Sequence, residues 1–219
     1  MTRRQKNIIA GPVFRLKVTL VDTESPIWRC LLVPTNMLLG DFHFVLQDAM
    51  GWTNSHLHEF IAGGEWTFDF VTGGTCYGNI QFDEEGDMED EFSTTLGGIL
   101  KQPGDRIAYV YDFGDNWTHS ILLEEILSSV PAGVEVPSCL EGKRACPPDD
   151  CGGTSGYSEL LDILADPDHE EYENMKSWVE SMVEGKFDSE AFDLKKVNRS
   201  IRQNRTRTLT ERAMRNSGL

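Results

Sequence analysis

The sequence predicts an α+β protein with a mainly antiparallel sheet, one early helix and a C-terminal helical region. Strand-like segments fill the chain up to residue 127 and are interrupted by only one clear helical segment. Helical segments then follow an irregular stretch that ends at residue 157. Strands that lead and helices that follow are typical of α+β proteins rather than of regular βαβ folds. With 219 residues, 39% of them hydrophobic, the chain is large enough to bury a core.

The first two predicted strands cover residues 13–21 and 26–34. In VFRLKVTLV, apolar and polar residues alternate, which indicates a half-buried strand. PIWRCLLVP is an apolar run between two prolines, and the preceding serine and proline favour a turn. The side chains of the first strand that we expect to face the core are Phe14, Leu16, Val18 and Leu20.

A helix is predicted within GDFHFVLQDAMGW, because apolar residues recur there at helical spacing. Asp41 is a suitable N-cap, and Gly51 is a suitable stop beyond the last turn. The apolar face of this helix consists of Phe42, Val45, Leu46, Ala49 and Met50.

Residues 55–70 predict two strands joined at the Gly-Gly pair of SHLHEFIAGGEWTFDF. Residues 106–113 and 117–127 predict a hairpin with a three-residue loop, 114–116. Asn116 is the loop residue best able to adopt a left-handed backbone conformation. A loop of this length pairs the following residues across the hairpin: Phe113 with Trp117, and Tyr111 with His119.

Charge is distributed unevenly along the chain. The formal net charge is −16, but residues 195–219 carry +7 and the first six residues carry +3, which leaves −26 for the body between them. A body this acidic repels phosphate backbones, so we do not expect it to bind nucleic acid. The basic C-terminal segment could contact nucleic acid, although a solvated tail is the simpler interpretation. We divide the chain into a basic extension (1–12), an α+β domain (13–198) and a basic tail (199–219).

No apolar run reaches the ~20 residues of a membrane helix, and MTRRQKNIIAGPVF lacks the apolar centre of a secretory signal. Five cysteines without an export signal favour reduced thiols inside a cell. We therefore expect a cytoplasmic protein with no membrane contact. Residues 83–91 hold seven acids in nine positions, and a solvated loop explains them better than a calcium site.

Two groups of residues could bind zinc. His56 and His58 lie two positions apart in an expected strand, so both imidazoles share one face, although such a pair is also a common surface feature with no role. The irregular segment 136–157 contributes three thiols: Cys139, Cys146 and Cys151. Three thiolates and a histidine such as His119 would complete a tetrahedral site. The C-x6-C-x4-C spacing is not the usual C-x2-C, which favours buried cysteines without metal.

The sequence contains no established catalytic signature. Phosphate-binding, dinucleotide-binding, nucleophile-elbow and H-E-x-x-H patterns are all missing from it. Cys146 with His119 could form a nucleophilic pair, and Asp112 with Asp115 an acid–base pair. However, the expected hairpin places Asp112 and His119 on opposite faces, and aspartates in hairpin loops are more often turn formers. We therefore assign no catalytic residue.

Five stretches occur in order along the chain: PIWRCLLVP, LGDFHFVLQDAMGWTNSHLHEF, YVYDFGDNWTHSILLE, CLEGKRACPPDDCGGTSGY and FDLKKVN. From Val13 to Asn198 the chain closely resembles the plasmid ORF-3-like family, named after a reading frame of an Ri plasmid. This resemblance implies a mixed α+β fold in a prokaryotic cytoplasmic protein. It also implies an occasional association with mobile elements, since some members are labelled passenger proteins of insertion elements. It implies no established reaction.

The chain departs from the family at Arg29-Cys30, where many relatives have two basic residues. The position that matches Cys151 is not always cysteine in the family, which weakens a three-thiolate site. The SHLHEF and DFGDNW-T-H matches are close, and they supply the best functional candidates: His56, His58, Asp112, Asp115, Asn116, Trp117 and His119.

The leading hypothesis is a non-enzymatic binding module for a protein or a small ligand. Its predicted ligand-binding residues are Asp112, Asp115, Asn116, Trp117 and His119. The alternative is a zinc-binding protein or metal-dependent enzyme, with ligands drawn from His56, His58, His119 and the three loop cysteines. A third hypothesis makes residues 195–215 a nucleic-acid-binding arm.

Overall fold

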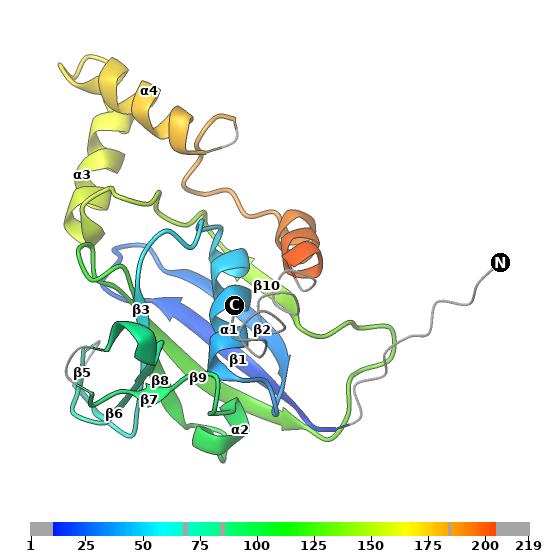
Figure 1. Cartoon of the computed structure of the whole chain (residues 1–219). Coiled ribbons are helices and arrows are strands. Elements are labelled where there is room, and N and C mark those ends of the chain that lie inside the picture. Colours follow the sequence, from blue (N-terminus) through cyan, green and yellow to red (C-terminus); the bar gives the residue numbers. More distant parts are fainter. Residues whose placement is uncertain (1–10, 68–69, 84–85, 184, 205–219) are drawn as a thin grey trace.

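An eight-stranded sheet forms the body of the protein in the computed structural model, which describes residues 11–67, 70–83, 86–183 and 185–204 (Figure 1). The strand order is β10-β2-β1-β9-β8-β3-β6-β7, and every neighbouring pair is antiparallel except β6 with β7. The strands are β1 (Val13–Leu20), β2 (Ile27–Pro34), β3 (His58–Ala62), β4 (Glu65–Thr67), β5 (Phe70–Thr72), β6 (Thr75–Gly78), β7 (Glu89–Asp90), β8 (Arg106–Tyr111), β9 (Trp117–Leu127) and β10 (Ser138–Lys143).

The helices confirm the predicted α+β class. Helix α1 lies between β2 and β3 in the chain, whereas α3, α4 and a further helix at residues 194–204 follow the last strand. The bounds of the helical elements are α1 (Leu39–Met50), η1 (Ile80–Phe82), α2 (Leu96–Ile99), α3 (Gly153–Ala165) and α4 (Tyr172–Met182). Within the described ranges, no helix has both the length and the apolar character needed to cross a membrane.

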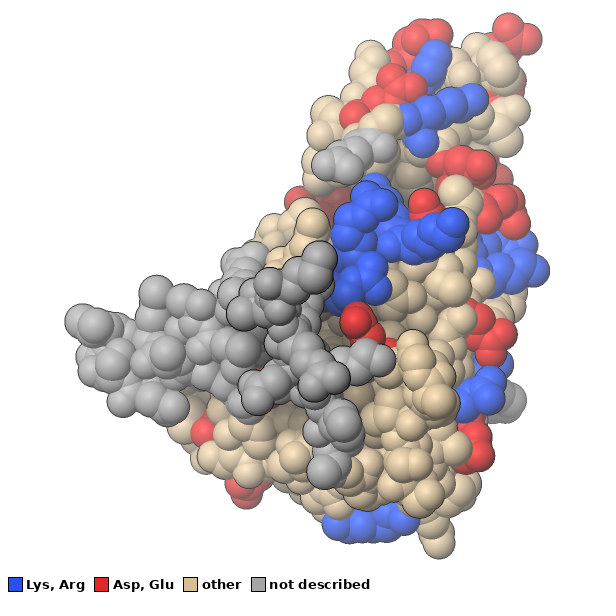
Figure 2. Space-filling model, turned by 90° about the vertical axis from the view of Figure 1, so that its right-hand side faces the viewer, with Lys and Arg blue, Asp and Glu red and all other residues tan. Residues whose placement is uncertain are grey.

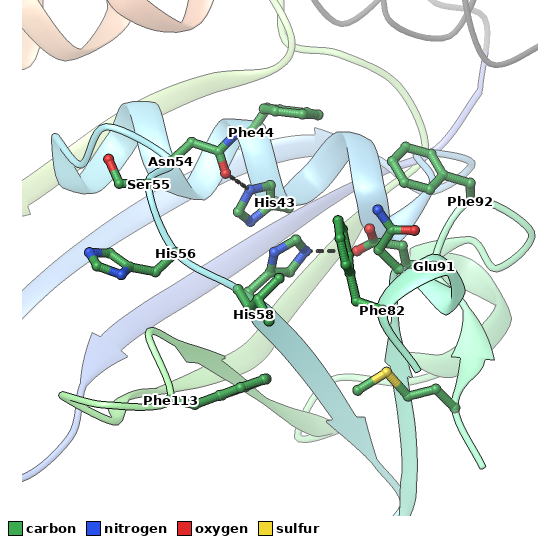
Figure 3. Close-up of a pocket in the computed structure, with 13 residues that line it drawn as sticks. His43, Phe44, Asn54, Ser55, His56, His58, Phe82, Glu91, Phe92 and Phe113 are labelled. Atoms are coloured by element: carbon green, nitrogen blue, oxygen red, sulfur yellow. Dashed lines mark hydrogen bonds and ion pairs between the residues drawn. The ribbon is translucent and has the colours of Figure 1, made fainter. Parts of the chain in front are cut away.

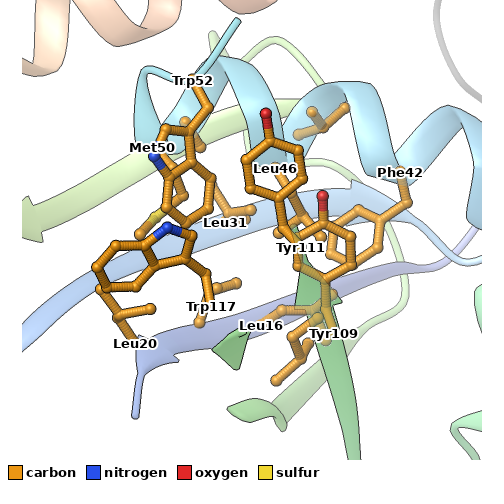
Figure 4. Packing of buried hydrophobic residues seen from close by; sticks show 14 of the residues in the cluster. Leu16, Leu20, Leu31, Phe42, Leu46, Met50, Trp52, Tyr109, Tyr111 and Trp117 are labelled. Carbon is orange, nitrogen blue, oxygen red and sulfur yellow. The ribbon is translucent and has the colours of Figure 1, made fainter. Parts of the chain in front are cut away.

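The main core lies between α1 and one face of the sheet (Figures 1 and 4). The apolar face predicted for β1 is confirmed, since Phe14, Leu16, Val18 and Leu20 are all buried in this cluster. The apolar residues predicted for α1 are buried there as well. Burial of aliphatic and aromatic side chains on this scale is the main source of the stability of the fold.

The start of α1 differs from the prediction, whereas its end agrees with it. The helix begins two residues before Asp41, which therefore lies in the first turn, and Leu38 is its N-cap. Gly51 ends the helix as predicted, in a left-handed conformation with φ 101°. Beside that end, the buried guanidinium of Arg29 donates hydrogen bonds to the carbonyl oxygens of Ala49 (2.8 Å) and Lys143 (2.9 Å). Arg29 thus joins α1 to the β10 edge of the sheet.

The β8–β9 hairpin is confirmed, but its register differs from the predicted one. Its loop has five residues, 112–116, because Asp112 is already left-handed at φ 59° and its Oδ1 accepts a hydrogen bond from the amide of Gly114. Asn116 is left-handed as predicted, at φ 54°. The register shifts by two, which keeps the side chains of the residues that still pair on their expected faces, whereas Phe113 now lies in the loop. The pairs are Tyr111 with Trp117, and Tyr109 with His119.

The two strands predicted within residues 55–70 are present, as β3 and β4 on either side of the Gly63-Gly64 pair, but they do not pair with each other. Strand β3 pairs with β6 and β8, whereas β4 pairs with β5 in a separate two-stranded sheet. The chain does turn at Gly63, where φ is 77°, but β4 then leaves the main sheet. The chain returns to the main sheet as β6 directly after Gly74. A residue with a side chain would not fit there, because its Cβ atom would lie 2.6 Å from the carbonyl oxygen of Ala62.

The helix at residues 194–204 packs against the domain rather than standing apart from it. Ile201 is buried in the main core, and Ser200 donates a hydrogen bond to Asp48 of α1 (2.9 Å). The predicted boundary between domain and tail, at 198/199, falls inside this helix. Lys and Arg side chains gather on this side of the molecule (Figure 2), and those of the helix are exposed at Lys195, Lys196, Arg199 and Arg202. Residues 205–219 lie outside the described ranges.

We predict that Asn198→Ala destabilises the protein by about 1–3 kcal/mol, the cost of leaving buried backbone groups unpaired. The Asn198 side chain accepts a hydrogen bond from the amide of Cys139 (2.9 Å) and donates one to its carbonyl oxygen (2.8 Å), at the point where the register of β10 shifts. Urea unfolding measures the change, with the exposed Arg199→Ala as the control on the same helix. Equal effects of both substitutions would contradict this role.

Candidate functional site

A pocket of about 320 Å³ opens where α1, the start of β3 and the β8–β9 loop meet (Figure 3). Two histidines, His43 of α1 and His58 of β3, lie at its centre. A pocket of this size suits a small organic molecule. The other residues that line it are Phe44, Asn54, Ser55, His56, Leu57, Asn79, Phe82, Met88, Glu91, Phe92 and Phe113.

His43 is held in one orientation by a buried hydrogen-bond network. Its Nε2 lies 2.6 Å from Oδ1 of Asn54, and its Nδ1 lies 2.8 Å from the hydroxyl of Tyr109. Because an amide oxygen can only accept, Nε2 must carry the proton, and Nδ1 must accept from Tyr109. Gln47 completes the network by donating to the Tyr109 hydroxyl (3.0 Å) and accepting from the backbone amide of Asn54 (2.9 Å). Every polar group of the network is thereby satisfied with a neutral imidazole.

The rings of His43 and His58 stack face to face. Their centroids lie 3.5 Å apart, and the ring planes differ by 5°. Burial, followed by the neighbouring His58, holds the pKa of His43 well below its usual range. His58 in turn directs Nε2 at Oε2 of Glu91, 2.8 Å away. Two imidazolium rings at this separation would repel each other, which is a further reason why His43 stays neutral.

The acidic loop at residues 83–91 was expected to be solvated. Glu91 differs from this expectation, because only 1% of its surface is exposed. A buried carboxylate requires a hydrogen-bonding or charged partner, and His58 supplies one. Of the other described acids of that loop, Asp87 and Glu89 are exposed as predicted, whereas the carboxylate of Asp83 accepts hydrogen bonds from the amides of Gly86 and Met88.

The rim of the pocket is aromatic. Phe82 of η1 is 62% exposed, and Phe113 of the β8–β9 loop is 51% exposed. No Lys or Arg is among the residues that line the pocket in the described part of the chain. Acidic groups lie nearby instead, because His56 faces Asp112 and Asp150. The pocket therefore combines apolar walls with a negative surrounding charge.

The structure separates the residues that the sequence grouped as ligand-binding candidates. Trp117 and His119 are fully buried in the core, Asn116 forms the exposed turn, and Asp115 accepts a hydrogen bond from the amide of Gly152 (3.1 Å). Only Asp112 lies near the histidines, with Oδ2 3.6 Å from Nδ1 of His56.

His119 belongs to the core. Its Nδ1 lies 3.2 Å from the carbonyl oxygen of Tyr109, its ring meets Trp52 edge-on, and burial lowers its pKa to about 4. In the described residues its Nε2 has no hydrogen-bond partner. A core position of this kind favours a permanently neutral ring.

The residues considered as zinc ligands also separate. Of the described residues, only His56, Asp112 and Asp150 bring three ligand atoms together, and they do so without a thiol. Burial raises the pKa of Cys139 to about 11 and that of Cys151 to about 12, and it holds the pKa of Cys146 well above its usual value. In the absence of a metal ion these groups are therefore protonated thiols.

Sequence reasoning missed His43, Glu91 and the two phenylalanines of the rim. His43 and Gln47 lie one helical turn apart on the face of α1 that was expected to be apolar, and such a polar pair among core positions is a detectable signal. Glu91 ends an acidic run and is followed by Phe92, a change from polar to apolar character that could have marked it. Phe113 was assigned to the wrong register.

Fold and site together define an α+β protein with a histidine-centred, aromatic-rimmed pocket at one end of an antiparallel sheet. The resemblance noted in the sequence is confirmed by comparison with known families. The chain belongs to the plasmid pRiA4b ORF-3-like protein family, whose profile matches residues 12–196.

Two relatives support this assignment. The uncharacterized protein y4hQ of Sinorhizobium fredii (strain NBRC 101917 / NGR234) is 35% identical over 201 residues, which cover 88% of this chain and 92% of that protein. The crystal structure of MM3350 from Methanosarcina mazei Go1, a protein of unknown function, is similar with a TM-score of 0.71 and 36% identity. That match covers 84% of this chain and 97% of the other. The comparisons establish family and fold, and neither relative carries a stated activity.

We predict that Tyr109→Phe destabilises the protein by about 1–3 kcal/mol, because it leaves His43 and Gln47 without their shared buried partner. Urea unfolding at neutral pH measures the change. Tyr77→Phe on β6 is the control, since no hydrogen bond to the Tyr77 hydroxyl is present among the described residues, and we expect a change within about 0.5 kcal/mol. A Tyr109→Phe variant as stable as this control would contradict the network.

A second prediction concerns pH. The pKa of His119 is about 4 in the folded protein and about 6.5 in an unfolded chain. Between these values the unfolded chain binds more protons, so stability falls as pH decreases through this window, by about 3 kcal/mol for His119 alone. His43, whose pKa is also lowered, adds to the loss in the same direction.

Urea midpoints at several pH values between 7 and 4 measure this dependence. In His119→Asn, whose amide nitrogen takes about the place of Nδ1 and can donate to the carbonyl oxygen of Tyr109, the loss of stability should be shallower than in the wild-type protein. An unchanged slope would show that His119 does not titrate as described.

Proposed function

We propose that the protein binds small, flat molecules that are uncharged or cationic, in the pocket above the stacked His43 and His58 rings. The observation that carries this proposal is the combination of exposed phenyl rings at the rim with a fixed imidazole pair beneath them. A protein of this kind is a binding module, as the sequence favoured, and its ligand is a small molecule.

Apolar contact comes from the rim. Large aromatic side chains exposed around a concavity usually mark a place where a ligand removes them from water. Phe82 projects from the short helix η1 and Phe113 from the β8–β9 loop, and Phe44 and Phe92 also line the pocket (Figure 3). Flat ligands suit such walls because offset stacking on aromatic rings is favourable.

Polar recognition comes from His58. Because Glu91 accepts a hydrogen bond from Nε2, the neutral ring offers Nδ1 as an acceptor. The described residues provide no hydrogen bond to this nitrogen, so a ligand N–H group is a suitable partner. Glu91 also fixes the ring plane, which lowers the entropy cost of binding.

Charge narrows the ligand class. Glu91 lines the pocket, and the carboxylates of Asp112 and Asp150 flank His56 at its edge. An anionic ligand would meet these groups with no Lys or Arg in the described lining to offset them. A neutral or positively charged ligand avoids this repulsion.

Three ligands with one ring system test the proposal: indole, tryptamine and indole-3-acetate. We expect indole and tryptamine to bind, and indole-3-acetate to bind at least about tenfold more weakly, a difference of about 1.4 kcal/mol. Ligand-observed NMR or calorimetry gives the affinities. Tight binding of indole-3-acetate, or no binding of the other two, would reject this ligand class.

Substitutions locate the binding. Phe82→Ala and Phe113→Ala should each weaken binding of indole, whereas Ile80→Ala should not, because Ile80 is exposed on the same short helix but does not line the pocket. All three side chains are at least half exposed, so folding should be unaffected. Equal affinities in the three variants would place the ligand elsewhere.

A further inference from the structure

Beside the pocket, three loops bring an imidazole and two carboxylates together. His56 comes from the segment before β3, Asp112 from the β8–β9 loop, and Asp150 from the Cys- and Pro-rich loop before α3. Each offers one ligand atom, and these atoms all lie within 4.8 Å of one another. We propose that His56, Asp112 and Asp150 bind a divalent transition-metal ion, Zn²⁺ or Mn²⁺.

The ligand atoms are available for an ion. One oxygen of Asp112, Oδ1, is used by the amide of Gly114, while Oδ2 faces His56 at 3.6 Å. On the other side, Nε2 of His56 lies 3.3 Å from Oδ1 of Asp150. Nevertheless, that nitrogen is buried and makes no hydrogen bond to any described residue. A buried ring nitrogen without a hydrogen bond, next to carboxylates, is a site at which a cation would be stabilised.

The cluster carries more negative charge than its own residues offset. Asp149, next to Asp150, is also largely buried; one of its oxygens accepts from Thr53 (2.8 Å), and the other has no partner among the described residues. In the described part of the chain, neither Asp112, Asp149 nor Asp150 forms an ion pair with Lys or Arg. A bound divalent cation would relieve this repulsion.

The surrounding loops hold the cluster together. Asp115 accepts a hydrogen bond from the amide of Gly152, which ties the β8–β9 loop to the loop that carries Asp150. The two loops touch closely, because a Cβ atom on Gly153 would lie 2.6 Å from the carbonyl oxygen of Asp115. Ligands positioned in this way before the ion arrives lose little entropy on binding it.

The donor set indicates which ions suit the site. Imidazole favours Zn²⁺ and similar transition metals, and carboxylates favour Mn²⁺, so a mixed set fits these ions better than Ca²⁺, which prefers oxygen ligands alone. Three protein ligands leave at least one coordination position open. His56 also lines the neighbouring pocket. The metal proposal does not depend on a pocket ligand, because the ion alone tests it.

The experiment titrates the full, untagged, metal-free chain with MnCl₂, followed by electron paramagnetic resonance of free Mn²⁺, and with ZnCl₂ against a chromophoric chelator. We expect one ion per chain. His56→Asn and Asp150→Asn should each weaken binding at least about tenfold, because even the loss of an outer-shell partner has effects of that size. Asparagine tolerates the left-handed backbone of Asp150 (φ 61°), so folding should be retained, and circular dichroism checks this.

Two controls make the result decisive. Asp22→Asn removes a carboxylate from another left-handed position (φ 58°), outside the cluster, and should bind metal as the wild-type protein does. Cys151→Ser tests the thiol alternative. Stoichiometric binding that survives both cluster substitutions, binding that depends on Cys151 instead, or no stoichiometric binding at all would each overturn the proposal.

Discussion

The buried hydroxyl of Tyr109 is the interaction on which both the fold and the pocket depend. It lies on β8, near the middle of the sheet, and hydrogen bonds to His43 and Gln47 of α1. Asn54 closes the same network from the segment that leads into β3. The hydroxyl of Tyr109 therefore joins the sheet to the helix, and Asn54 joins the connecting segment to the same two helix residues. A shift of α1 against the sheet would leave several buried polar groups unpaired, so the network fixes a single position for the helix, which apolar packing alone does less well.

Much of this fold could be predicted from local patterns in the sequence. The alternation in β1, the helical spacing in α1 and the left-handed preference of Asn116 each depend on neighbouring residues only. In those places local preference and tertiary packing agree, and the predictions hold. The family resemblance implied the same α+β class for residues 13–198; the family profile matches residues 12–196, and the similar crystal structure supports the class.

The site could not be predicted in the same way, because it is made of long-range contacts. Glu91 is buried only because His58, 33 positions earlier in the chain, meets its carboxylate. In the sequence, His43 only interrupts a run of apolar residues. Its buried partner, the hydroxyl of Tyr109, is far away in the chain and is known only from the structure. The predicted register of the β8–β9 hairpin was wrong for a different reason. The side chain of Asp112 accepts a hydrogen bond from the amide of Gly114, and the loop therefore begins two residues earlier than predicted. Side-chain bonds of this kind compete with strand pairing and are hard to detect in sequence alone.

Four histidines differ in how deeply their rings are buried, and this burial decides which of them can contact a ligand. His119 is sealed in the core, where burial lowers its pKa to about 4. His43 is also kept neutral by burial, but it exposes one ring face to its partner in the stack. His58 is held by a carboxylate and lines the pocket, and His56 lies between two aspartates at its edge. The inner rings therefore act as structure and carry no charge, whereas His58 and His56 are the rings placed to contact the proposed ligand and the proposed metal ion.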